Sequence, residues 1–217
     1  MKLFIDTANL DEIKEANDMG ILDGVTTNPS LMAKVGVRGE NAITDHYRKI
    51  CEMVDGDISA EVTTSDFNGM IEEGKRLAAI HRNIVVKVPM IKDGVKAIKW
   101  LTDNGIRVNC TLIFSAGQAL LAAKAGAVYV SPFIGRIDDS GWDGTILIRQ
   151  IAAIFSIQQY KTQILAASIR TANHIVECAE LGAHVCTCPL APILGLLKHP
   201  LTDIGLAKFL EDAKKSV

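Results

Sequence analysis

The sequence predicts one (β/α)8 barrel that occupies residues 1–217. Short runs rich in β-branched residues alternate with segments whose apolar residues repeat about every 3.6 positions, the period of an amphipathic helix. Eight such runs are present, and they follow one another at intervals of about 26 residues, close to the length of one βα unit. An open doubly wound sheet, the main alternative, usually has about five or six parallel strands, so eight units favour a closed barrel.

The strands are expected where β-branched and apolar residues concentrate. In chain order they are Leu3–Asp6, Gly24–Thr27, Ile58–Val62, Ile84–Val88, Arg107–Cys110, Ala127–Ser131, Gln163–Ala167 and His184–Thr187. No linker or low-complexity segment divides these units, so we expect a single domain.

The helical pattern is clearest in three of the segments that separate the strands. These are Asp66–Ile80, Gly94–Asn104 and Ser115–Ala125. Thr64 or Ser65 is expected to cap the first of them, and Ser115 the third, because a short hydroxyl side chain can accept from a free N–H of the first turn. The last segment, Leu201–Lys215, is also amphipathic, and we expect it to pack on its own barrel or on a neighbouring subunit.

The composition is ordinary for a globular protein, with 48% hydrophobic and 22% charged residues and a formal net charge of −2. This charge gives no general attraction to nucleic acid or to an anionic membrane, so neither is expected as a partner. No apolar run approaches the roughly 18 residues of a membrane span, and MKLFIDTANL predicts a first strand and not a signal peptide. The five cysteines match no disulfide framework, and we expect reduced thiols in a cytoplasmic protein.

Metal ions and cofactors are not expected. The five histidines are scattered along the chain, and no glycine-rich segment matches a phosphate loop or a dinucleotide fingerprint. A local phosphate site needs only one or two cations and some backbone N–H groups, so phosphorylated ligands are compatible with the sequence.

Polar side chains recur at the C-terminal ends of seven consecutive predicted strands. Alternate residues of a barrel strand point into the lumen, and active sites of such barrels lie at these strand ends. The residues are Asp6, Asn28, Glu61, Lys87, Asn109 with Thr111, Ser131 with Phe133, and Ser168 with Arg170. On the seventh strand, we expect Ala166, Ser168 and Arg170 to share one face.

Each of these residues also has a purely structural interpretation. Asp6, Thr111 and Ser168 could be helix caps, Asn28 a turn residue before Pro29, and Glu61 the partner of a surface cation. Seven coincidences of register are harder to explain by chance than one, so we interpret the set as an active site.

Lys87 is the most informative member, because it lies within the apolar run Ile-Val-Val-Lys-Val-Pro. Burial disfavours the charged ammonium, and the neutral amine is the form that attacks a carbonyl to give a Schiff base. Two alternatives are a buried ion pair with Asp6 or Glu61 and a phosphate-binding lysine. We favour the interpretation of Lys87 as a nucleophile, because carboxylates from the first and third strands and a threonine from the fifth are expected around it.

Six segments of the chain resemble the transaldolase family. They are FIDTAN around Asp6, GVTTNPSL around Asn28, VVKVPM around Lys87, NCTLIFS around Thr111, YVSPFIGRID around Phe133 and AASIR around Ser168. The resemblance covers nearly the whole chain. The short length is similar to that of the small subfamily that also contains fructose-6-phosphate aldolase.

The resemblance implies a class I transaldolase that uses a lysine Schiff base. Lys87 would attack the ketose carbonyl, Asp6 would act as acid and base on a sugar hydroxyl, and Glu61 and Thr111 would move protons during imine formation. Substrate binding would fall to the remaining residues of the pattern, with hydroxyls held by Asn28, Asn109 and Ser131, Phe133 beside the imine, and the phosphate held by Arg136, Ser168 and Arg170. It also implies a homo-oligomer, a decamer of two pentamers.

Two residues separate transaldolase from the aldolase branch of the same family. By the resemblance, the aldolase branch carries Gln at the position of Glu61 and Tyr at that of Phe133. A Tyr hydroxyl near the imine could help a proton reach the carbanion and release dihydroxyacetone, whereas Phe cannot. Glu61, Phe133 and Asn109 therefore favour transfer between sugar phosphates, from sedoheptulose 7-phosphate to glyceraldehyde 3-phosphate. Fructose-6-phosphate aldolase activity, or a non-covalent isomerase or sugar-phosphate binder, remains as an alternative.

Overall fold

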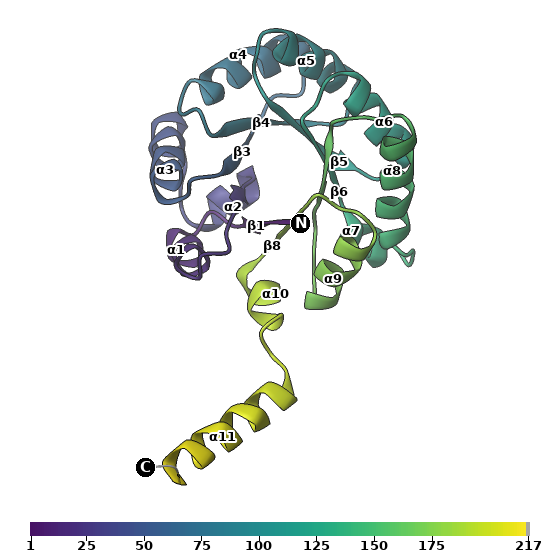
Figure 1. The fold of residues 1–217 in the computed structure, drawn as a ribbon. Helices are drawn as coiled ribbons and strands as arrows, with labels where there is room; N and C mark the ends of the chain where they lie inside the picture. Colours follow the sequence, from purple (N-terminus) through teal and green to yellow (C-terminus); the bar gives the residue numbers. More distant parts are fainter. Residues whose placement is uncertain (216–217) are drawn as a thin grey trace.

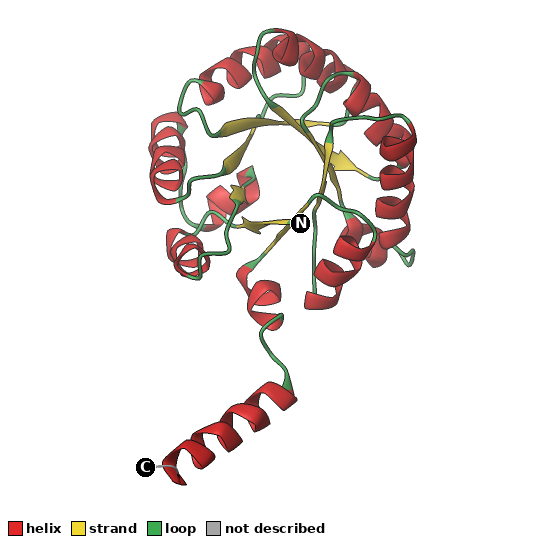
Figure 2. Ribbon diagram, in the orientation of Figure 1, coloured by secondary structure: helices red, strands yellow, loops and turns green. Residues whose placement is uncertain are grey.

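A computed structural model, in which residues 1–215 are described, contains a closed barrel of parallel strands in the order β1 to β8 (Figures 1 and 2). The strands are β1 Lys2–Asp6, β2 Gly24–Thr26, β3 Asp57–Glu61, β4 Ile84–Pro89, β5 Val108–Ile113, β6 Tyr129–Pro132, β7 Gln163–Ala166 and β8 Val185–Cys188. β1 pairs with both β2 and β8, which closes the barrel. The predicted fold class is confirmed, and every predicted strand overlaps an observed one.

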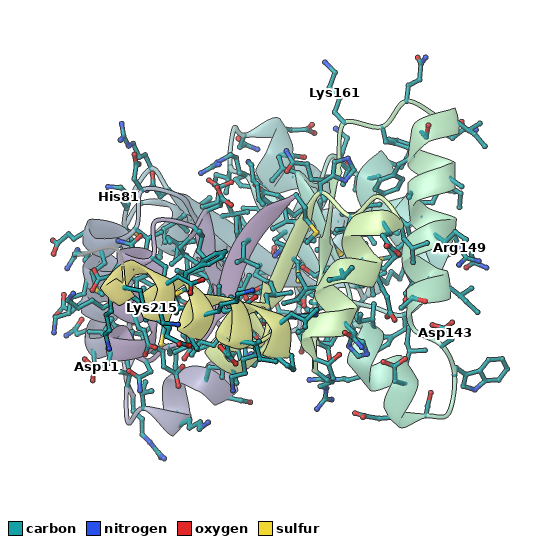
Figure 3. The ribbon with its side chains drawn as sticks, turned by 60° about the horizontal axis from the view of Figure 1, so that its bottom comes forward. Asp11, His81, Asp143, Arg149, Lys161 and Lys215 are labelled. Atoms are coloured by element: carbon teal, nitrogen blue, oxygen red, sulfur yellow. The ribbon has the colours of Figure 1, made fainter. Side chains whose placement is uncertain are left out.

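Helices surround the barrel as an outer layer, except for the C-terminal helix, which extends away from it (Figure 2). They are α1 Leu10–Asp18, α2 Pro29–Lys34, α3 Glu40–Met53, α4 Phe67–Ala78, α5 Lys92–Asp103, α6 Ala116–Lys124, α7 Ile134–Asp139, α8 Thr145–Ile157, α9 Ala172–Glu180, α10 Leu190–Gly195 and α11 Pro200–Lys215. Figure 3 shows charged side chains such as Arg149 and Lys161 pointing outward at the periphery. Among the described residues, no helix combines the length and the apolar character that crossing a membrane requires.

The N-terminus of α4 differs from the expectation, because its cap is Asp66 and neither Thr64 nor Ser65. Asp66 Oδ1 accepts a hydrogen bond from the N–H of Gly69 at 2.9 Å. Thr64 is engaged elsewhere, since its N–H and hydroxyl both donate to Glu73 Oε2. The cap of α6 is Ser115, as predicted, and it forms a reciprocal capping box with Gln118.

Two apolar regions make up the core, and they determine where along the barrel axis polar side chains begin to line the lumen. The larger one lies between the strands and the helices, and the smaller one lies inside the lumen and consists of Phe4, Val85, Tyr129, Leu165, Ala167 and Val185. Because side chains alternate along a strand, Asp6 follows Phe4 and Lys87 follows Val85 on the inward face. The register places Glu61, Lys87 and Asn109 side by side on three adjacent strands.

The C-terminal helix α11 extends away from the barrel (Figure 1). Its apolar side chains are exposed, with Leu201 70% and Phe209 73% accessible, and none of its described residues is buried. The expectation that this helix packs on its own barrel is therefore wrong, because α11 continues outward beyond α10. Packing on a neighbouring subunit stays a prediction.

Candidate active site

The amine of Lys87 lies at the centre of the polar layer, buried to 5% accessibility. Its Nζ lies 3.0 Å from Glu61 Oε2 and donates to the main-chain oxygen of Thr27, also at 3.0 Å. The buried ion pair that the sequence left open as an alternative is therefore present. Such a pair contributes little net stability because both charges lose their hydration, so it leaves room for a chemical role.

A cavity of about 100 Å³ opens beside this amine at the C-terminal end of the barrel. Seven of the predicted site residues line it, namely Asp6, Asn28, Lys87, Ser131, Phe133, Arg136 and Ser168. Its remaining lining residues are Thr26, Ala167 and Thr187. Residues from β1, β2, β4, β6 and β8 and the segments that follow β2, β6 and β7 thus converge on one space, as the ring of strand ends predicts.

Two threonines that sequence reasoning missed connect to Asp6. Thr26 Oγ1 donates to Asp6 Oδ1 at 2.6 Å, and Thr187 Oγ1 lies 2.7 Å from Thr26 Oγ1. Because the Thr26 proton is committed to the carboxylate, Thr187 is the donor in the second bond. This directed chain orients the Asp6 carboxylate. Thr187 ends the predicted eighth strand, so the inward alternation of that strand was the signal that could have found it.

Asn109 belongs to a second hydrogen-bonded chain, below the cavity. Its Oδ1 accepts from Ser131 Oγ at 2.8 Å, and its Nδ2 donates to Ser59 Oγ at 3.1 Å. Asn109 is fully buried and does not line the cavity. Its observed contacts therefore orient Ser131, which does line the cavity.

Thr111 and Asn28 differ in how their side chains are satisfied. Thr111 is 1% accessible, and among residues 1–215 its Oγ1 has no hydrogen-bond partner. Buried hydroxyls are usually paired, so this one is an exception, and Thr111 does not line the cavity beside Lys87. Asn28 caps α2, accepting from the N–H of Leu31 at 2.9 Å, and lines the cavity as well. Asn28 therefore has the structural role of a helix cap, and its place in the cavity wall is also compatible with substrate binding.

The end of β7 departs from the predicted alternation. Ala166 belongs to the outer core, whereas Ala167 faces the lumen and pairs with Phe133. Ser168 reaches the cavity because its backbone turns into the left-handed region, with φ at 60°. The expectation that Ala166, Ser168 and Arg170 share one face is therefore wrong, since this turn breaks the period of two.

The segments that carry Arg136 and Ser168 meet in a close backbone contact between Gly135 and Ser168. The N–H of Gly135 donates to the main-chain oxygen of Ser168 at 3.1 Å, and a Cβ at position 135 would lie only 2.1 Å from that oxygen. Arg136 stacks its guanidinium 4.8 Å from the Phe133 ring centre. Arg170 instead donates to Asp139 at 2.7 Å, is about half exposed, and does not line the cavity.

Glu61 faces a second, larger cavity of about 440 Å³ between α2, α3 and α4. Thus Glu61 separates this largely apolar space from Lys87. Among residues 1–215, no group of three or more His, Cys, Asp or Glu side chains is arranged to hold a metal ion.

Comparison with known proteins assigns this arrangement to a family. The family model described as transaldolase/fructose-6-phosphate aldolase matches residues 3–217. The chain belongs to the transaldolase/fructose-6-phosphate aldolase family. It is 65% identical to a probable transaldolase of Parabacteroides distasonis and 65% identical to one of Cytophaga hutchinsonii, over 99% of this chain and 99% of each relative. The family resemblance of the six segments is thereby confirmed.

The solved structures show the same architecture at much greater distance. Inosine 5'-monophosphate dehydrogenase from Legionella pneumophila superposes with a TM-score of 0.56 at 14% identity. The match covers 85% of this chain and 57% of that longer one. This likeness concerns the barrel fold alone.

Proposed function

We propose that the protein is a class I transaldolase that moves a dihydroxyacetone unit between sugar phosphates through a Schiff base on Lys87. The observation that supports this most is the buried amine between a carboxylate and a cavity. Glu61 Oε2, 3.0 Å away, can take the ammonium proton and release the nucleophile. The relatives named probable transaldolase support the same activity.

The proposed reaction begins with attack of the neutral amine on the C2 carbonyl of a ketose phosphate. The resulting carbinolamine loses water to give the imine, and Glu61 and Thr111 return and remove the protons that this step requires. The unpaired hydroxyl of Thr111 supports its part in this step. Asp6, aligned by Thr26, then takes the proton of the C4 hydroxyl.

Loss of that proton breaks the C3–C4 bond and releases the shorter aldehyde. The electron pair of the broken bond moves toward the cationic imine nitrogen, which stabilises the three-carbon carbanion as an enamine. Addition to the carbonyl of an acceptor aldose phosphate, protonation of the new hydroxyl by Asp6, and hydrolysis of the imine restore Lys87.

The two ends of the substrate are assigned from the residues around the cavity. Asn28 and Ser131 would hold hydroxyls of the dihydroxyacetone unit, with Asn109 orienting Ser131. Arg136 and Ser168 would hold the phosphate. Arg170 can join them only by leaving Asp139.

Assembly and location are proposed with the activity. The exposed apolar side chains Leu206, Phe209 and Leu210 of α11 support a homo-oligomer, for which we propose the decamer of two pentamers. All five cysteines are free and buried, which supports a cytoplasmic location. We also propose that residues 1–217 form one domain, which the single closed barrel of eight strands supports.

Trapping with borohydride tests the covalent mechanism. Fructose 6-phosphate and borohydride should leave a substrate-derived adduct on Lys87, detected by peptide mass spectrometry. The variant Lys87→Met should lose the adduct and all measurable turnover, while the control Lys161→Met, at the periphery in Figure 3, should keep both. An active wild-type protein without any adduct would refute covalent catalysis and favour a non-covalent isomerase or binder.

The need for an acceptor aldose distinguishes transfer of the dihydroxyacetone unit from its release as free dihydroxyacetone. We expect fructose 6-phosphate to be consumed rapidly with erythrose 4-phosphate present and slowly without it. Phe133 lines the cavity and offers no proton to the carbanion, so Phe133→Tyr should raise the ratio of dihydroxyacetone release to transfer by about 10-fold. Equal rates with and without acceptor in the wild type would identify an aldolase instead.

A further inference from the structure

The two acceptors of the Lys87 amine belong to different strand ends, and one phenol contacts both ends. The amine donates to the main-chain oxygen of Thr27, directly after β2, and pairs with Glu61, the last residue of β3. Tyr47, on α3, places its hydroxyl 2.7 Å from Thr27 Oγ1. The main-chain N–H of Glu61 also lies close enough to this phenol to lower its pKa.

The direction of these hydrogen bonds follows from their neighbours. Thr27 Oγ1 lies 3.1 Å from the main-chain oxygen of Ser59, which can only accept. The single hydroxyl proton of Thr27 is therefore used there, and Tyr47 must donate to Thr27 Oγ1. The result is one directed chain from Tyr47 through Thr27 to the main-chain oxygen of Ser59, which links α3 to β3 and to the segment directly after β2, beside the main-chain N–H of Glu61.

The phenol of Tyr47 keeps its proton throughout the neutral range. Tyr47 is only 2% accessible, and burial raises its pKa to about 12. A neutral phenol keeps the proton that it donates to Thr27 Oγ1, so the chain from Tyr47 to Ser59 persists at neutral pH.

Packing alone does not explain this hydroxyl. Tyr47 and Glu61 both line the cavity of about 440 Å³, beside apolar side chains such as Met32, Ile43 and Leu77. A phenylalanine ring would fill the same space and make the same apolar contacts. The hydroxyl is therefore the part of Tyr47 that is specific to the strand ends and, through them, to the amine.

We propose that Tyr47 is a positioning residue that fixes the two acceptors of the Lys87 amine and thereby sets its direction of attack. The inference rests on the proposed role of Lys87 as nucleophile. Reacting groups that shift by about 1 Å can lose about 100-fold in rate. Loss of the phenol hydroxyl should therefore slow imine formation by about 10- to 100-fold and change KM for the sugar phosphate much less, because Tyr47 lies outside the cavity beside Lys87.

The test compares two buried tyrosines that differ in which group they hold. Tyr47→Phe removes the hydrogen bond to Thr27, whereas the matched control Tyr129→Phe removes a phenol that is 3% accessible and donates to Asp57 at 2.8 Å, away from the amine. The single-turnover rate of borohydride-trapped adduct with fructose 6-phosphate is measured for both. We expect the large loss in Tyr47→Phe only, and equal losses in the two variants would overturn the proposal.

A second readout follows the amine without any sugar phosphate. Formaldehyde and cyanoborohydride methylate free lysine amines, and peptide mass spectrometry gives the extent at each lysine between about pH 6 and pH 9. Tyr47→Phe should change the pH dependence at Lys87 and leave that at Lys161 unchanged. An unchanged Lys87 profile would refute the inference. An active wild-type protein without a sugar adduct would refute the proposed function instead.

Variants of Thr27 keep the inference testable if Tyr47→Phe does not fold. Thr27→Ser retains the hydroxyl that joins Tyr47 to Ser59, whereas Thr27→Val removes it with almost no change in volume. We expect Thr27→Ser to form the adduct at a rate near that of the wild type and Thr27→Val to resemble Tyr47→Phe. Wild-type rates in Thr27→Val would contradict the proposal.

Discussion

The buried pair of Lys87 and Glu61 predicts a strong energetic coupling between the two side chains. Their accessibilities are 6% and 16%, and Nζ lies 3.0 Å from Oε2. Removing one partner of a buried pair costs about 3–5 kcal/mol, because the other charge is left without compensation. Glu61 keeps some contact with solvent, so we expect Lys87→Met to lower the free energy of unfolding by about 2–4 kcal/mol.

Removing both charges should cost less than the two single losses together. In Lys87→Met/Glu61→Gln no buried charge remains, so the coupling free energy of the cycle should be about 1–3 kcal/mol. Urea unfolding gives the free energy of unfolding of the wild type, the two single variants and the double variant. All four are measured at one protein concentration, because assembly changes the apparent stability.

An exposed pair supplies the control for this cycle. Lys215 and Glu211 are 66% and 67% accessible, so the cycle of Lys215→Met and Glu211→Gln should give less than about 1 kcal/mol. The reasoning would be refuted if the stability losses of Lys87→Met and Glu61→Gln summed to that of the double variant within about 0.5 kcal/mol. Such additivity would mean that the two side chains do not interact as a charge pair in solution.

Four further predictions concern other parts of the molecule. Thr187→Val should lower kcat about 10-fold by releasing the chain that orients Asp6, and steady-state kinetics showing full activity would contradict this role. Gly135→Ala should weaken substrate binding about 10-fold or more, seen as a higher KM, because its Cβ would meet the Ser168 oxygen at 2.1 Å; an unchanged KM would exclude that dependence. Glu73, whose pKa is lowered because hydrogen bonds from Thr63 and Thr64 outweigh burial, contributes stability at neutral pH that is lost as pH falls through its folded pKa. Glu73→Gln should therefore cost about 1 kcal/mol at neutral pH, after allowing for solvent screening, and progressively less in acid, and a difference from wild type that urea titrations find constant with pH would refute the assignment. Phe209→Asp should reduce the assembly size measured by light scattering, since Phe209 is 73% exposed on α11, and an unchanged mass would argue against α11 as an interface.

Local sequence patterns predicted the barrel and most of the site because they depend on strand alternation. The step from Val85 to Lys87 places one side chain in the apolar layer and the next inward side chain in the polar layer. Ser168 shows where this logic stops, because its positive φ resets the alternation after β7. Serine at that position does not signal such a turn, and the partner of its main-chain oxygen, the N–H of Gly135, lies 33 residues away in the sequence.

Other differences arise from competition between partners that are distant in sequence. Thr64 does not cap α4, because Glu73 accepts both of its hydrogen bonds. Arg170 has Asp139 as a partner 31 residues away, which the strand pattern around AASIR does not reveal. Tyr47 was missed since it lies within a helix, 20 residues after Thr27, and only the folded chain brings its phenol to Thr27.

The apolar layer beneath Lys87 has a kinetic consequence. Phe4, Val85, Leu165 and Val185 are fully buried and close the lumen below the amine. The cavity above this layer lies at the C-terminal strand ends and is small, about 100 Å³. In the proposed transfer, the first aldehyde must depart before the second arrives, so initial-velocity plots with both sugars varied should give parallel lines, the pattern of a ping-pong mechanism.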